Sequence, residues 1–175
     1  MNVLAFAASN SKKSINKVLA AYTANLIESA TVDVLDINDY EMPLFSEDRE
    51  KELGKPEQAR EFIQKIGNAD AIIVSFAEHN GTYTAAYKNL FDWASRITKD
   101  VFQNKPTVFL STSPGPGGAA TVLESAVNSA PHFAADMKAS ISVPSFYDNF
   151  DLDANTVTSD KIQHELLQAM QLLAA

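Results

Sequence analysis

Short apolar runs alternate along the chain with segments in which apolar residues recur every three or four positions. The first run covers residues 3–7 and ends at a polar turn. Apolar residues then follow at helical spacing, namely Ile15, Val18, Leu19, Tyr22 and Leu26. A short continuous run is typical of a buried strand and the wider spacing of a helix, so the pattern predicts a strand, a loop and a helix.

The same alternation continues in the next part of the chain. Residues 32–35 predict a second strand, whereas residues 36–55 are acidic and contain proline, which predicts a long connection with little regular structure. Pro56 is suited to open the next helix. The apolar face of that helix consists of Ala59, Phe62, Ile63 and Ile66. A glycine and an asparagine then predict its end before a third strand at residues 71–76.

The second half of the chain predicts two more strands and three more helices. A helix carries the apolar residues Tyr87, Leu90, Phe91 and Trp93. Pro106 introduces a fourth strand at residues 107–110, and a helix over residues 119–128 follows. A fifth strand near residues 139–143, an irregular segment and a final helix over residues 160–173 complete the pattern.

Five strand–helix units with continuous apolar strands favour a parallel sheet covered by helices on both faces. Right-handed crossovers favour a doubly wound, flavodoxin-like three-layer α/β/α sandwich. We expect one domain over residues 1–175, with the five-stranded parallel sheet in the order 2-1-3-4-5. This order brings the loops after the first, third and fourth strands to one switch point, where ligands bind in such sheets.

Composition narrows the classes of function. The formal net charge is −8 and the basic residues form no dense cluster, so we expect neither nucleic acid nor a membrane surface as a partner. The chain has no cysteine, which makes any redox chemistry depend on a bound cofactor. His132 and His164 show no metal-ligand pattern. The apolar start reads as a strand rather than a signal peptide, so a cytoplasmic protein is expected.

The loop after the first strand is rich in groups that can bind a phosphate. Hydroxyl and amide side chains at a helix N-terminus donate to an anion, and the helix dipole favours its charge. The predicted phosphate ligands are Ser9, Ser11, Ser14 and Asn16, together with the backbone of Ile15. A simpler alternative is that Ser14 only caps the helix and the neighbouring lysines form a solvated turn. The loop matches neither the Walker pattern nor the dinucleotide glycine fingerprint.

The loop after the third strand and its helix carry a recognisable motif. They resemble the NADPH-dependent FMN reductase family, in which a proline-glutamate-tyrosine-asparagine-glycine-serine loop precedes a leucine-lysine-asparagine-aliphatic-aspartate-tryptophan helix. The matching residues are Glu78, Asn80, Gly81, Lys88, Asn89, Asp92 and Trp93. Ser9, Ser14 and Asn16 resemble the family's first motif, and residues 111–118 resemble its third. The arginine of the first motif is replaced by Ser11, which removes a bidentate phosphate donor.

The resemblance implies FMN as cofactor, NADPH or NADH as co-substrate and a small-molecule electron acceptor such as a flavin or a quinone. It also implies a homodimer or homotetramer. The residues that it places beside the flavin ring are Glu78, His79, Asn80, Gly81, Ser113, Gly115, Gly117 and Gly118. No side chain is assigned as catalytic, because the flavin itself carries the hydride, and no metal is expected.

Several of these assignments have simpler alternatives. His79 is as well explained as an ordinary polar loop residue, and Glu78 as a carboxylate that holds its loop through a hydrogen bond. Lys88 and Asp92, four positions apart, can form only a helix-surface ion pair. For the chain as a whole, the alternatives to a reductase are an FMN-binding electron-transfer or sensor module, and a flavodoxin-like domain that binds another phosphorylated ligand.

Overall fold

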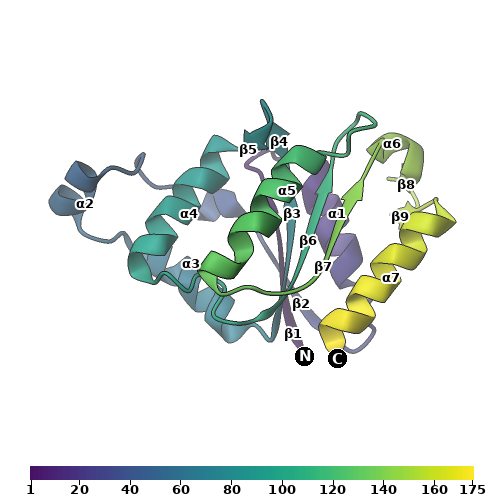
Figure 1. The fold of residues 1–175 in the computed structure, drawn as a ribbon, viewed down its shortest axis with the longest axis horizontal. Helices are drawn as coiled ribbons and strands as arrows, with labels where there is room; N and C mark the ends of the chain where they lie inside the picture. Colours follow the sequence, from purple (N-terminus) through teal and green to yellow (C-terminus); the bar gives the residue numbers. More distant parts are fainter.

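A parallel five-stranded sheet forms the centre of the computed structural model, which describes residues 1–175 (Figure 1). Its strand order is β2-β1-β3-β6-β7, and every neighbouring pair runs parallel. These strands are β1 (Asn2–Ala8), β2 (Thr31–Leu35), β3 (Ala71–Phe76), β6 (Pro106–Thr112) and β7 (Asp136–Val143). The predicted flavodoxin-like order 2-1-3-4-5 is therefore confirmed.

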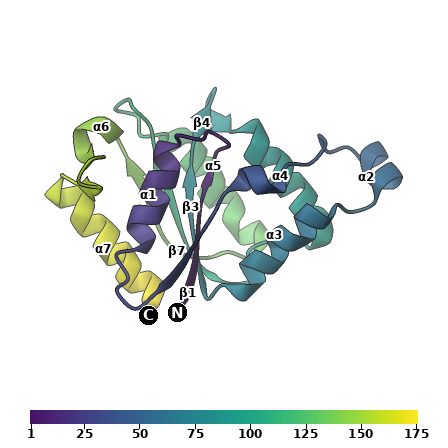
Figure 2. The same cartoon turned by 180° about the vertical axis from the view of Figure 1, so that it is seen from behind.

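Helices cover both faces of this sheet, as Figures 1 and 2 show from opposite sides. One face packs against α1 (Ile15–Ala24) and α7 (Asp160–Ala174), and the other against α3 (Glu57–Asn68), α4 (Ala85–Ile97) and α5 (Ala120–Ser129). None of the helices has the length and apolar character that crossing a bilayer requires. The three-layer α/β/α arrangement is confirmed.

The central strands are largely apolar because both of their faces are buried. Along β1, Leu4 and Phe6 enter the core under α3, α4 and α5, whereas Val3 and Ala5 enter the core under α1 and α7. Successive side chains of a strand point to opposite faces, so a strand inside a three-layer sandwich has no position left for a polar stripe.

The prediction of little regular structure for residues 36–55 is wrong. This segment contains a 3-10 helix, η1 (Ile37–Tyr40), and a two-turn helix, α2 (Glu47–Leu53), which projects away from the sheet in Figure 1. No residue of α2 is buried, so it has no apolar face for a periodicity search to find. Its ends are set locally: the Ser46 hydroxyl accepts from Arg49 N at 3.1 Å, and Gly54, at φ 71°, ends it.

Short elements also replace two segments that were expected to be irregular. Residues 77–84 form a hairpin of β4 (Glu78–His79) and β5 (Thr82–Tyr83). Its two loop residues, Asn80 and Gly81, both have positive φ, which is the geometry that favours an Asn-Gly pair in a tight hairpin. The segment before α7 holds α6 (Phe146–Asn149), β8 (Phe150–Asp151) and β9 (Thr156–Val157), while η2 (Ala130–Phe133) follows α5.

Candidate functional site

The loops that follow β1, β3 and β6 meet at the carboxyl edge of the sheet and enclose a cavity of about 330 Å³. Ligand pockets in proteins begin at roughly this size. Eight of the residues predicted for the site line the cavity: Ser9, Ser11, Ser14, Ile15, Asn16, Glu78, His79 and Ser113. The remaining five, Asn80, Gly81, Gly115, Gly117 and Gly118, do not line it.

The N-terminus of α1 opens into this cavity. Ser14 is the N-cap, and its hydroxyl oxygen accepts from Lys17 N at 3.2 Å. The N–H groups of Ile15 and Asn16, the first two of the helix, have no acceptor within the chain. Free N–H groups at a helix start carry partial positive charge and point out along the helix axis, so they form a site for an anion.

Hydroxyl groups border the same opening. Ser9 is 7% exposed, and its oxygen accepts from Ser11 N at 3.2 Å, which fixes the turn between β1 and α1. In both Ser9 and Ser14 the oxygen accepts while the hydroxyl hydrogen stays free to donate. Ser14 thus caps α1, and this role is compatible with a donor role at the cavity. Lys13 adds one ammonium group to the lining.

The Asn16 side chain is engaged inside the protein. Its oxygen accepts from Ser75 Oγ at 2.7 Å and from Thr112 N at 3.1 Å, and its nitrogen donates to the Thr112 carbonyl at 3.1 Å. Asn16 is 3% exposed. The side chain ties the start of α1 to β3 and β6, so the group that Asn16 offers to a ligand is its backbone N–H.

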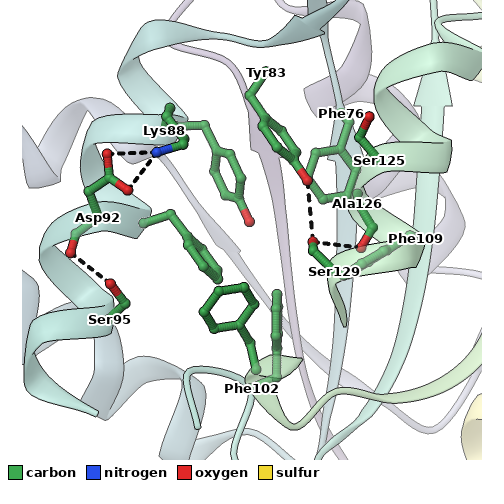
Figure 3. Close-up of a pocket in the computed structure, with 13 residues that line it drawn as sticks. Phe76, Tyr83, Lys88, Asp92, Ser95, Phe102, Phe109, Ser125, Ala126 and Ser129 are labelled. Carbon is green, nitrogen blue, oxygen red and sulfur yellow. Dashed lines mark hydrogen bonds and ion pairs between the residues drawn. The ribbon is translucent and has the colours of Figure 1, made fainter. Parts of the chain in front are cut away.

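The hairpin after β3 supplies a second wall of the cavity. His79 is exposed there, whereas the Glu78 carboxylate accepts from the N–H of Val122 in α5 at 2.9 Å. Asn80 and Gly81 occupy the exposed turn of the hairpin. The observed contact is therefore the one expected if Glu78 holds its loop through a hydrogen bond. Lys88 and Asp92 form an ion pair at 2.7 Å on the surface of α4, as expected from their spacing (Figure 3).

The glycines of the third loop differ in their surroundings. Gly115 and Gly117 have open space where a Cβ would stand. Gly118 has a φ of 57°, and a Cβ there would collide with the Ser142 hydroxyl and lie 3.1 Å from the backbone of Pro144. Its carbonyl accepts from Ser111 Oγ at 2.7 Å and Ser142 Oγ at 3.0 Å. Gly118 thus lets the loop pack against the end of β7.

Five lining residues were not among the predicted site residues, namely Lys13, Ala77, Thr112, Pro114 and Tyr147. Thr112 is the last residue of β6, and its hydroxyl donates to the Val143 carbonyl at 2.7 Å. Tyr147 lies in α6 and is 60% exposed. In the sequence, Tyr147 is only an aromatic residue in a segment without periodicity, and no local pattern connects that segment with the cavity.

The cavity has the chemistry of a binding site. The structure contains no group of three histidine, aspartate or glutamate side chains that could hold a metal ion. What faces the opening is a helix N-terminus, several hydroxyls and a lysine, which together match a phosphorylated ligand. The donor set therefore fits the phosphate end of a mononucleotide.

Comparison with known proteins agrees with this geometry. The model of the family described as NADPH-dependent FMN reductase matches residues 1–148. The chain is 37% identical over 111 residues to a 2-hydroxy-1,4-benzoquinone reductase from Burkholderia sp, covering 62% of this chain and 58% of that protein. It is 34% identical over 96 residues to an NADPH:quinone oxidoreductase from Arabidopsis thaliana, covering 55% of this chain and 47% of that protein. The chain thus spans about half the length of these two relatives.

A solved structure is similar to this chain over the full length of the fold. The flavoenzyme NAD(P)H:(acceptor) oxidoreductase from Paracoccus denitrificans superposes with a TM-score of 0.76 and 25% identity. The alignment covers 99% of this chain and 95% of that one.

Proposed function

This chain belongs to the NADPH-dependent FMN reductase family, and we propose on that basis that it is an NAD(P)H-dependent oxidoreductase that holds FMN and reduces a flavin, a quinone or another small acceptor. The observation that carries the proposal is the start of α1. There two N–H groups without acceptors and the hydroxyls of Ser9 and Ser14 face one cavity. A phosphate is the ligand that such a donor set suits.

We assign the two ends of the cofactor to different loops. The hydroxyls of Ser9, Ser11 and Ser14 and the backbone of Ile15 and Asn16 hold the phosphate. The ring lies beside the hairpin after β3 and the loop after β6. The residues proposed there are Glu78, His79, Asn80, Gly81, Ser113, Gly115, Gly117 and Gly118.

The protein contributes binding and orientation to the reaction. When bound, FMN supplies the redox chemistry, which is two-electron transfer from a reduced nicotinamide to a second substrate. The helix N-terminus and the serine hydroxyls hold the charged end of the cofactor in place. The Glu78–Val122 bond fixes the hairpin beside the ring. His79 lines the cavity and is exposed, so the hairpin side of the cavity borders solvent.

The same proposal includes the organisation of the protein. We infer a single domain over residues 1–175 that assembles as a homodimer or homotetramer and acts in the cytoplasm without nucleic acid or membrane partners. The net charge of −8 supports the absence of a nucleic-acid partner. The homo-oligomer is what the resemblance to the family implies.

Anaerobic reduction tests the reductase activity. The full chain, loaded with FMN, should lose its visible flavin absorption when NADH or NADPH is added, and recover it when a quinone follows. Protein that retains FMN but is reduced by neither nucleotide would contradict the reductase and favour an FMN-binding electron-transfer or sensor module. Protein that binds no FMN would contradict both.

A further inference from the structure

A short helix, α6, borders the cavity beside the start of α1 from outside the three loops. Its residue Tyr147 lines the cavity and is 60% exposed. In Figures 1 and 2, α6 and the hairpin after β3 lie on opposite sides of the start of α1. The hairpin is the proposed place of the flavin ring, so Tyr147 stands at the end of the cavity where the phosphate is proposed to bind.

The fold holds α6 in place without using the Tyr147 side chain as its anchor. The preceding residue, Phe146, is fully buried and stacks on Phe150 with ring centroids 4.9 Å apart. The N–H of Phe146 donates to the Ser113 carbonyl at 3.0 Å, which ties α6 to the loop after β6. A side chain carried on a fixed backbone loses less conformational freedom when it binds a ligand.

The wall that α6 shares with the loop after β6 has few donors left for a ligand. The Thr112 and Ser113 hydroxyls donate to backbone carbonyls at 2.7 and 3.2 Å. Pro114 has no N–H group. The Tyr147 hydroxyl makes no hydrogen bond within the chain, so it is the remaining side-chain donor of this wall.

The opposite wall supplies its donors from one direction. The proposed phosphate donors all lie within residues 9–16, at the turn and the first two N–H groups of α1. A phosphate monoester has three strong acceptor oxygens, which point in different directions. An oxygen turned away from α1 therefore needs a donor from the other wall, and a tyrosine hydroxyl can supply it.

We propose that Tyr147 is a phosphate ligand contributed by a fourth segment of the chain, and that its hydroxyl donates a hydrogen bond to a phosphate oxygen on the side away from α1. The inference rests on the proposed FMN site and adds to it a residue that lies outside all three motifs. A hydrogen bond to a charged acceptor is stronger than one between neutral groups. Its loss is therefore measurable even at an exposed residue.

Affinities for two flavins test the proposed bond. The apo-protein is titrated with FMN and with riboflavin, which lacks the phosphate, and flavin fluorescence is followed. Tyr147→Phe should weaken FMN binding about fivefold to tenfold, the effect of one hydrogen bond to a charged group, and leave riboflavin binding unchanged. Tyr40→Phe is the matched control, because Tyr40 is buried and does not line the cavity, and it should change neither affinity.

A second measurement observes Tyr147 itself and needs no flavin. The five tyrosines are replaced by 3-fluorotyrosine, and the ¹⁹F resonance of Tyr147 is identified by its loss in Tyr147→Phe. Inorganic phosphate added to the apo-protein should shift this resonance saturably, whereas sodium chloride at equal ionic strength should not. In Ser14→Asp, whose added charge repels the anion, the shift should be lost at the same phosphate concentrations.

Three results would overturn the inference: an unchanged FMN affinity in Tyr147→Phe, an equal loss of affinity for FMN and riboflavin, and a Tyr147 resonance that phosphate does not move. If these occur in a chain that still binds FMN and is reduced by NADH or NADPH, the proposed function stands and only the role of Tyr147 fails. A chain that binds no FMN, but whose Tyr147 resonance shifts with phosphate, would instead keep the phosphate contact and contradict the proposed function.

Discussion

The Glu78 carboxylate accepts a hydrogen bond from the backbone N–H of Val122 at 2.9 Å and thereby joins the hairpin after β3 to the first turn of α5. This helix lacks a cap of its own, because its N-cap residue is Ala119, whose side chain has no acceptor. Glu78 supplies from elsewhere in the chain the acceptor that a serine or aspartate cap usually supplies locally. The contact thus connects a predicted ring-binding loop with the stability of the fold.

Replacement of Glu78 by alanine should lower the free energy of unfolding by about 1 kcal/mol, since the first turn of α5 loses its acceptor. Glu78→Gln keeps an oxygen acceptor and should lose only part of this amount. Urea denaturation of both variants measures the difference. Equal stability of Glu78→Ala and the wild-type protein would show that the bond contributes nothing.

Gly118→Ala should destabilise the fold by about 1–3 kcal/mol, because the added methyl group meets Ser142 and the backbone of Pro144 at a positive φ. Gly117→Ala is the matched control, because nothing lies within 4 Å of its Cβ position. Its free energy of unfolding should stay within about 0.5 kcal/mol of wild type. Thermal or urea unfolding of the two variants compares adjacent glycines directly, and similar losses in both would contradict the packing role of Gly118.

Asn16→Ala should destabilise the protein by about 2–3 kcal/mol, because it leaves the Ser75 hydroxyl and both backbone groups of Thr112 without their partner. Asn68→Ala, at an exposed asparagine in the last turn of α3, provides the control and should change stability by less than about 0.5 kcal/mol. The measurement is again the free energy of unfolding in urea. A stable Asn16→Ala protein would mean that the buried network tolerates its loss.

Ser14→Asp should reduce FMN affinity roughly tenfold or more while the affinity for riboflavin stays nearly unchanged. Aspartate also caps a helix, so α1 is preserved, but its charge repels the phosphate that only FMN carries. Fluorescence titration of the apo-protein with each flavin gives the two affinities. A parallel loss for FMN and riboflavin would place the phosphate elsewhere.

Acid should remove the contribution of the Lys17–Asp36 ion pair to stability. The Lys17 ammonium donates to Asp36 at 2.7 Å, and this bond, with a second from Asn38 N–H, holds the pKa of the Asp36 carboxyl below its usual value of 3.8. Because the folded state binds this proton more weakly than the unfolded state, the contribution is complete well above pH 3.8 and is lost as pH falls through the lowered pKa.

The pair is about one third exposed, so solvent screening limits its contribution to roughly 0.2–1 kcal/mol. The difference in unfolding free energy between the wild-type chain and Asp36→Asn should be present at pH 7 and shrink below about pH 4. Lys17→Met should show the same trend, because it removes the other partner. A difference that stays constant with pH would exclude the ion pair as its source.

The sequence by itself determined the layers of this protein and the order of their elements. Strands such as β3, apolar at five of its six positions from Ala71 to Phe76, have to be buried on both faces, and that requires helices above and below. The three loops could be placed at one edge, because the carboxyl ends of parallel strands lie on the same side of a sheet. Periodicity and chain direction are local properties, so they can be read without coordinates.

The tertiary structure alone decided which polar groups find partners. Asn16 looked like a ligand residue, yet its side chain bonds to Thr112, which lies 96 positions further along the chain. Tyr147 reaches the cavity beside the start of α1 from a segment without periodicity, and Tyr87 of α4 packs edge to face against Phe76 of β3. Hydrogen bonds and cavities depend on residues that approach only after folding, and no local pattern records which of them will meet.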